Sequence, residues 1–155
     1  MAQEKSCCFT GHRRILPEEQ AAVSGRLKDI LRQLCEDGCR DFYTGGALGF
    51  DTMAAEAVLE LRQSRSDVRL HLILPCQDQT RGWKPAEVAR YEAVLRAADT
   101  VTYTAKVYAP GCMQRRNRAL VDAATVCVAY LRRETGGTAY TVQYAQKKGI
   151  PVLSV

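Results

Sequence analysis

The chain has 155 residues, the length of a single domain, and we expect residues 1–155 to fold around one core. Hydrophobic residues make up 46% and charged residues 25%, as in ordinary globular proteins, and no apolar run approaches the ~20 residues of a transmembrane helix. The first residues lack the apolar core of a secretory signal, so we expect a cytoplasmic protein with no membrane partner. The net charge of +5 favours anionic ligands without separating nucleotides from nucleic acids.

The seven cysteines argue against both a disulfide framework and a metal site. Their number is odd, and no two are spaced as a CxxC pair. Cys35 and Cys39 lie four residues apart near the end of a predicted helix, but two thiols do not complete a zinc site. We therefore predict buried or inert thiols and no bound metal.

Apolar runs typical of strands alternate with helix-patterned stretches along the whole chain. The predicted strands are 6–10, 41–44, 68–74, 100–104, 125–130 and, at an edge of the sheet because it begins with proline, 151–155. The predicted helices begin at Pro17, Asp51, Pro85, Met113 and Gly136. Asp51 is the predicted N-cap of its helix, and His71, inside a strand, is expected to be structural.

Strands separated by single helices pair in parallel through right-handed crossovers, because a parallel connection needs a long return path. The sequence therefore predicts an α/β protein, a single Rossmann-like three-layer sandwich with a mainly parallel sheet. Ligands of such sheets bind at the carboxyl ends of the strands, near the point where strand order reverses.

The strongest local motif is Thr-Gly-Gly-Ala-Leu-Gly-Phe-Asp, which follows the second strand. Gly45, Gly46 and Gly49 leave backbone N–H groups uncovered where a helix begins, an arrangement that binds phosphate. The alternative is a tight turn in which glycine only permits positive φ. The motif is not GxGxxG, so the ordinary dinucleotide fingerprint is absent.

A second group of candidate residues follows the first strand, where Thr10, Gly11, His12 and Arg13 offer a hydroxyl, open backbone, an imidazole and a guanidinium. Arg13 is predicted to contact phosphate. For His12, ligand contact and a hydrogen bond to the backbone or a helix cap remain open.

Two further groups complete the predicted site. Gly136, Gly137 and Thr138 resemble an anion-binding turn in which the threonine hydroxyl also caps the helix. Arg116 and Asn117 are candidates for ribose or base contacts, or simply face water. In the loop after the third strand, Gln77, with Gln79 and Trp83, is a candidate to close over a base, although an isolated tryptophan is more often core.

Taken together, TGHR, TGGALGFD, LPCQ, RRN and GGT, in this order, resemble the SLOG superfamily, and its small YpsA-like branch in particular. The segment TGGALGFDTMAAEAVL is also similar to the nucleotide-fold motif of DNA-processing protein A. The resemblance implies a Rossmann-like domain that binds a nucleotide or nucleotide-derived ligand, often as a homodimer, and it implies no cofactor.

The related lonely-guy enzymes cleave the bond between base and ribose phosphate, and their PGGxGTxxE motif ends in a catalytic glutamate. Thr141 stands at the corresponding position here and cannot supply a carboxylate. Three hypotheses follow, in descending order: a nucleotide sensor or binding protein, a nucleoside-phosphate hydrolase that uses Asp51 or Asp122, and a module that binds single-stranded nucleic acid. The third is disfavoured because the charge excess is small.

Overall fold

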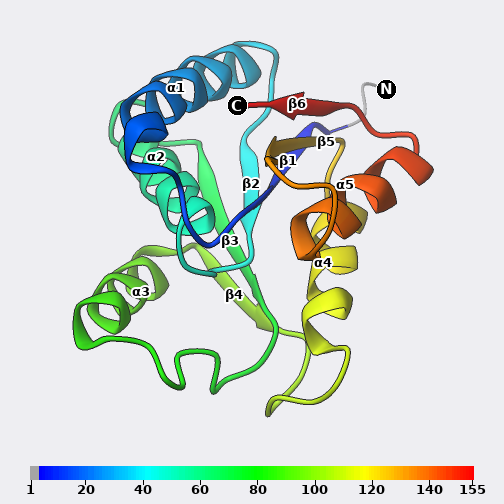
Figure 1. Cartoon of the computed structure of the whole chain (residues 1–155). Helices are drawn as coiled ribbons and strands as arrows, with labels where there is room; N and C mark the ends of the chain where they lie inside the picture. The colour runs from blue at the N-terminus through cyan, green and yellow to red at the C-terminus, as the bar shows by residue number, and fades with distance from the viewer. Residues whose placement is uncertain (1–3) are drawn as a thin grey trace.

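The computed structural model describes residues 4–155 and shows a parallel sheet between two layers of helices (Figure 1). Within these residues six strands lie in the order β4-β3-β2-β1-β5-β6, and every neighbouring pair is parallel. The strands are β1 (Ser6–Gly11), β2 (Asp41–Thr44), β3 (Arg69–Leu74), β4 (Thr100–Tyr103), β5 (Val126–Tyr130) and β6 (Val152–Ser154). The predicted α/β class is confirmed, and β6 lies at an edge as its proline indicated.

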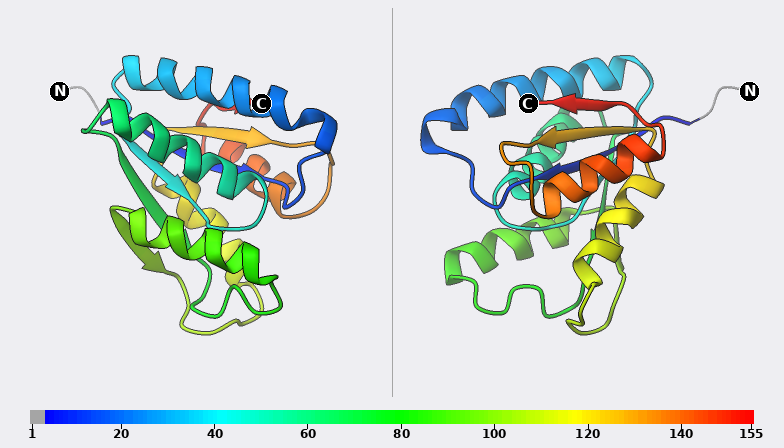
Figure 2. Two further views of the ribbon diagram at one scale, coloured as in Figure 1. Left: turned by 90° about the vertical axis from the view of Figure 1, so that its left-hand side faces the viewer. Right: turned by 45° about the vertical axis from the view of Figure 1, so that its right-hand side comes forward.

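A helix connects each strand to the next, which is why all pairings are parallel. The helices of the described chain are α1 (Gln20–Glu36), α2 (Phe50–Ser64), α3 (Pro85–Ala97), α4 (Cys112–Asp122) and α5 (Gly137–Lys147), with a 3-10 turn at Pro17–Glu19. Figure 1 shows α1, α2 and α3 on one side of the sheet and α4 and α5 on the other, and the views in Figure 2 agree. Within residues 4–155, every helix is too short or too polar to span a lipid bilayer.

The larger part of the apolar core lies between the sheet and the layer of α1, α2 and α3. Phe9 of β1 packs against Phe42 of β2 and Phe50 of α2, with ring centroids 6.2 and 6.4 Å apart. All three rings are fully buried. A smaller cluster lies beneath α4 and α5, and every cysteine of the chain is buried in one of these regions or under a loop, as predicted for inert thiols.

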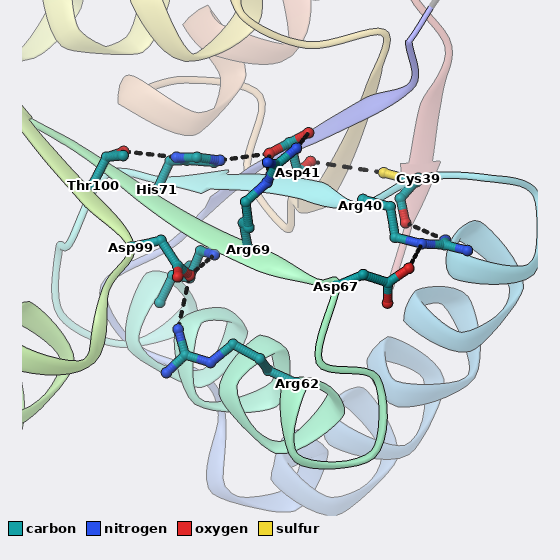
Figure 3. A network of polar contacts seen from close by, with 10 residues as sticks. Cys39, Arg40, Asp41, Arg62, Asp67, Arg69, His71, Asp99 and Thr100 are labelled. Carbon is teal, nitrogen blue, oxygen red and sulfur yellow. Dashed lines mark hydrogen bonds and ion pairs between the residues drawn. The ribbon is translucent and has the colours of Figure 1, made fainter.

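A network of polar contacts crosses the amino ends of β2, β3 and β4 (Figure 3). The Nε2 atom of His71 lies 2.7 Å from an Asp41 carboxylate oxygen, and its Nδ1 atom lies 2.6 Å from the hydroxyl of Thr100. Arg69 donates two further hydrogen bonds to the same carboxylate, at 2.8 and 3.0 Å. These contacts tie three strands together, which agrees with the structural role expected for His71.

The structure corrects two predicted helix caps. Gly49, rather than Asp51, is the N-cap of α2, because the loop reaches the helix through a backbone with φ of 76° that favours glycine. Asp51 therefore lies inside the first turn of α2. Gly136 is the N-cap of α5, and no side chain, including that of Thr138, makes a capping hydrogen bond there.

Candidate functional site

The candidate site is a pocket of about 240 Å³ at the carboxyl ends of β1 and β5. Strand order reverses between these two neighbours, since β2, β3 and β4 continue on one side of β1 and β6 lies beyond β5. The location is the one where sheets of this class bind ligands. The pocket is lined by Phe9, Thr10, Gly11, His12, Arg13, Ala47, Asp51, Met113, Arg116, Asn117, Leu120, Arg133, Gly137 and Thr138.

Glycines allow the loop after β1 and the loop after β2 to touch. A Cβ atom on Gly49 would lie 2.1 Å from the carbonyl oxygen of Arg13, and a Cβ atom on Gly11 would lie 2.4 Å from the ring of Phe50. The N–H of Phe50 donates to the carbonyl oxygen of His12 at 3.1 Å. Gly11 and Gly49 thus serve first to bring the two loops into contact, and the pocket forms beside that contact.

The two other glycines of the TGGALGFD motif, Gly45 and Gly46, lie against side chains of the protein itself. A Cβ atom on Gly46 would lie 2.5 Å from Cδ2 of Leu74, and its φ is 70°. Its carbonyl oxygen accepts a hydrogen bond of 3.2 Å from Nε2 of Gln79. For Gly46 the alternative interpretation, a turn that needs positive φ, describes the structure.

Arg116, in the second turn of α4, places a buried guanidinium at the floor of the pocket. Only 5% of the residue is exposed. Its Nη1 atom donates to the carbonyl oxygen of Gly45 at 2.5 Å, and its Nε atom donates to Oδ1 of Asn117 at 2.8 Å. Burial lowers the pKa of this guanidinium, and the charge of Asp51 opposes that effect. No carboxylate within residues 4–155 lies within ion-pair distance of Arg116, so its charge is not neutralised by direct contact.

Asp51 contributes a buried carboxyl group to the same pocket. One of its oxygens accepts a hydrogen bond of 3.2 Å from the N–H of Ala47, which closes the turn before α2. Burial raises the pKa of this carboxyl to about 6, and the charges of Arg116 and Arg13 oppose the shift. A group with this pKa exchanges its proton close to neutral pH.

His12 makes the backbone hydrogen bond that was one of its two predicted roles, and it also lies at the pocket. Its Nε2 atom accepts a hydrogen bond of 2.7 Å from the backbone N–H of Arg132, and its ring lines the pocket. Burial, assisted by the charges of Arg133 and Arg132, lowers the pKa of this imidazole, so it is neutral at pH 7. Its other ring nitrogen, Nδ1, lies 3.4 Å from Nη2 of Arg133, so both ring nitrogens face donors of the segment after β5.

The first turn of α5 forms the opposite wall. The first N–H groups of a helix have no partner within it, and they carry the positive end of the helix dipole. Gly137 and Thr138 lie in this turn and line the pocket, and a Cβ atom on Gly137 would lie 3.7 Å from the side-chain nitrogen of Asn117. The α5 N-terminus, Arg116 and the loop after β1 therefore surround one small volume with donors and positive charge.

Comparison with known proteins places this arrangement in a family. The family model YpsA, described as the YspA SLOG family, matches residues 17–150. The chain belongs to the YspA SLOG family. A UPF0398 protein of Bacillus thuringiensis (strain Al Hakam) is 31% identical over 130 residues, which are 82% of this chain and 71% of that protein. A UPF0398 protein of Halalkalibacterium halodurans is 30% identical over 118 residues, 74% of this chain and 62% of that protein.

Two solved structures share the fold of this SLOG chain. DNA processing protein A from Helicobacter pylori, studied for its binding of single-stranded DNA, superposes with a TM-score of 0.71 at 19% identity, over 97% of this chain and 65% of that one. DNA processing protein A from Streptococcus pneumoniae gives a TM-score of 0.69 at 16% identity, over 97% of this chain and half, 50%, of that one. This SLOG chain thus corresponds to only part of either protein.

The structure of the SLOG chain does not bring every predicted site residue to the pocket. Asp122 is at the far end of α4, where it accepts a hydrogen bond from Tyr144 and pairs with Lys148 at 3.5 Å. Gln77 packs its backbone against the loop before α4, donating its N–H to the carbonyl oxygen of Lys106. Gly45, Gly46, Gly49 and Gly136 shape the surrounding loops without lining the pocket themselves.

Thr141, the position compared with the lonely-guy glutamate, is fully buried in α5. Its hydroxyl donates to the carbonyl oxygen of Gly137 at 2.8 Å, and it does not line the pocket. A glutamate at this position in the present fold would have to enter the protein interior.

Sequence reasoning missed Arg133, which the SLOG fold brings to the site, and misplaced Gln79. Arg133 follows β5 and lines the pocket, but in the sequence it is one of several arginine pairs with no distinguishing pattern. Gln79, grouped with Gln77 as a base-closing residue, is instead buried, with Oε1 lying 3.5 Å from Nη1 of Arg116. No local motif separates these two glutamines, because only the path of the loop decides which one turns inward.

Proposed function

We propose that the chain binds a nucleotide or nucleotide-derived ligand in the pocket between β1 and β5, as a sensor or binding protein. The observation that carries this proposal is the buried guanidinium of Arg116, which faces the pocket with no carboxylate in contact among the described residues. A buried charge without an ionic partner is costly, and an anionic ligand supplies the missing partner.

The phosphate of the ligand would occupy the space between Arg116 and the first turn of α5. There the N–H groups of Gly137 and Thr138 and the helix dipole add to the guanidinium charge. His12 and Arg13 line the same volume from the loop after β1, and the charge of Arg13 acts on Asp51 there. Two of the segments that the sequence predicted to contact phosphate, the loop after β1 and the first turn of α5, line this volume, whereas Gly45, Gly46 and Gly49 do not.

The nucleoside would lie toward α4. Asn117 offers amide groups there, and Met113 offers an adaptable apolar surface. The side-chain oxygen of Asn117 already accepts a hydrogen bond from Arg116, so a ligand that contacts Asn117 also senses the orientation of that arginine. From the family resemblance we further propose a homodimer, which light scattering of the purified protein would test.

One observation favours hydrolysis as a second candidate function. Asp51 lines the pocket, and its pKa of about 6 suits a general acid or base near neutral pH. Its hydrogen bond with Ala47 gives the same carboxyl a structural role, which is why binding without turnover ranks first. Asp122 is a weaker candidate for general acid or base, because it lies at the end of α4 away from the pocket.

Calorimetric titration of the purified protein with nucleoside mono-, di- and triphosphates of the four common bases tests the proposal. Arg116→Lys retains the charge but loses the planar fork that reaches both Gly45 and Asn117, and we expect it to weaken binding at least tenfold. The matched control is Arg115→Lys, because the Arg115 side chain is exposed on the same helix and does not line the pocket. Equal affinities in all three proteins, or no binding by any of them, would overturn the proposal.

A further inference from the structure

A second hollow, of about 500 Å³, adjoins the pocket on the outer side of the loop after β1. We call it the arginine groove. It shares His12, Arg13 and Arg133 with the pocket, so these three residues line both hollows. The residues that line only the groove are Arg14, Leu16, Tyr130 and Arg132.

Three of the four arginines in the groove carry charge that the protein does not neutralise. Within residues 4–155, Arg13, Arg14 and Arg133 make no ion pair, whereas Arg132 pairs with Glu19 at 3.2 Å. Arg132 is held further by a hydrogen bond of 2.9 Å to the carbonyl oxygen of Val155. The groove therefore offers one fixed guanidinium and three available ones to an anionic ligand.

The groove also offers apolar and planar surface. Leu16, which lines the groove, is 48% exposed. The guanidinium of Arg132 already lies 4.3 Å from the centre of the Tyr130 ring, and arginine side chains stack on aromatic bases in the same way. Phosphate groups alone would leave this surface unused, whereas a nucleoside would cover it.

The volumes of the two hollows also indicate a ligand larger than a mononucleotide. The pocket, at about 240 Å³, is smaller than the roughly 300–1,000 Å³ of typical small-molecule sites. It can hold the phosphate and part of one nucleoside, and the adjoining groove has twice its volume. A ligand that fills both hollows has its centre at the shared wall of His12, Arg13 and Arg133.

We propose that the ligand is a dinucleotide whose phosphate bridge runs from the space between Arg116 and the first turn of α5 to the wall of His12, Arg13 and Arg133. The first nucleoside then lies toward α4, and the second lies in the arginine groove. This inference rests on the proposed function, because it extends the same site. It assigns Arg14 and Leu16, which do not line the pocket, a role in selecting a ligand with two nucleosides over a mononucleotide.

The test compares three ligands of each common base by calorimetry at pH 8. A nucleoside monophosphate and a dinucleoside diphosphate both carry about two negative charges at this pH, since the second phosphate pKa is about 6. A difference between them therefore reports the second nucleoside rather than charge. The nucleoside triphosphate, with more charge and one nucleoside, reports the contribution of phosphates alone.

We expect the dinucleoside diphosphate to bind at least tenfold more tightly than the monophosphate of the same base. Arg14→Ala and Leu16→Ser should each remove most of this advantage while leaving monophosphate affinity unchanged. Arg96→Ala is the matched control because Arg96 is exposed at the end of α3, away from both hollows, and makes no ion pair within residues 4–155.

The outcomes separate the two proposals. If monophosphates bind through Arg116 but dinucleotides gain nothing, the dinucleotide inference is wrong and the proposed function stands. If the triphosphate gains as much as the dinucleotide and only Arg14→Ala removes the gain, the groove binds phosphates and not a second nucleoside, which also overturns the inference. If no nucleotide binds the wild-type protein, both proposals fail.

Discussion

The Nη1 atom of Arg116 donates a hydrogen bond of 2.5 Å to the carbonyl oxygen of Gly45, across 71 residues of sequence. This contact joins the second turn of α4 to the glycine motif after β2. It is possible only because residue 45 has no side chain, since a Cβ atom there would lie 2.6 Å from the same Nη1 atom. The position of the buried charge in the pocket thus depends on a glycine that does not line the pocket.

A first prediction follows from this dependence. Gly45→Ala should displace the guanidinium of Arg116 and weaken nucleotide binding at least tenfold, although Arg116 itself is retained. Gly45 does not have the positive φ that makes alanine strained, so the variant should remain folded. Gly25→Ala is the control because nothing lies within 4 Å of its Cβ position, and it should leave affinity unchanged. Calorimetry on both variants decides between these outcomes.

A second prediction concerns the contact between the two loops. Gly49→Ala should cost at least ~3 kcal/mol in the free energy of unfolding, because its Cβ atom would lie 2.1 Å from the backbone oxygen of Arg13 and neither backbone can move freely. Gly149→Ala is matched in φ, 78° against 76°, but meets nothing within 4 Å, and should cost about 1–2 kcal/mol. Urea denaturation gives both values, and equal costs would contradict the interpretation of Gly49 as a contact residue.

The sequence predicted the architecture well and the inner geometry of the site less well. Alternating strand and helix patterns are local, and parallel strands end at one edge of the sheet, where the loop after β1 contacts the loop after β2. The inward turn of Gln79 and the approach of Arg133 depend instead on the paths of loops that carry no periodic signal. Asp122 was a candidate carboxylate by its residue type alone, and it lies six positions along α4 from Arg116, at the end of the helix away from the pocket.

A third prediction uses the pKa of Asp51, which burial raises to about 6 from 3.8. Between pH 4 and 6 the folded protein binds this proton more tightly than the unfolded chain does. The contribution of Asp51 to stability is therefore greatest below pH 4 and is lost as the pH rises to 6, by roughly 3 kcal/mol. Asp51→Asn keeps an acceptor for the N–H of Ala47 and does not titrate.

The unfolding free energy of Asp51→Asn should thus rise relative to wild type between pH 4 and pH 7. Denaturation curves of both proteins across this range measure the difference in unfolding free energy. The contributions of the other carboxyl groups cancel in this difference because those groups titrate in both proteins. A constant difference would show that the carboxyl has an ordinary pKa. At pH 7.5 the variant should also bind a phosphate ligand at least as tightly as wild type, because one negative charge has left the pocket.

A fourth prediction separates small ligands from nucleic acid, the third of the sequence-based hypotheses. A protein that contacts many phosphates loses affinity steeply as salt rises. The pocket and the arginine groove provide few available guanidiniums, so we expect only weak binding of single-stranded oligonucleotides at physiological salt. Fluorescence anisotropy with oligonucleotides of increasing length measures this directly. Tight binding that grows with oligonucleotide length and resists competition by mononucleotides would make nucleic-acid binding the leading hypothesis.

The last prediction concerns chemistry. We expect no efficient release of free base from nucleoside monophosphates, because the pocket has one carboxyl, Asp51, and a glycosidic cleavage of the lonely-guy type requires a carboxylate that Thr141 does not supply. Overnight incubation followed by chromatography detects the base.

Thr141→Glu is a poor probe here, since it would bury a carboxylate in the interior of α5 and destabilise the fold before it could test chemistry. Asp51→Asn is the informative variant. Rapid cleavage by the wild-type protein that disappears in Asp51→Asn, while nucleotide affinity is retained, would establish the hydrolase in place of the binding protein.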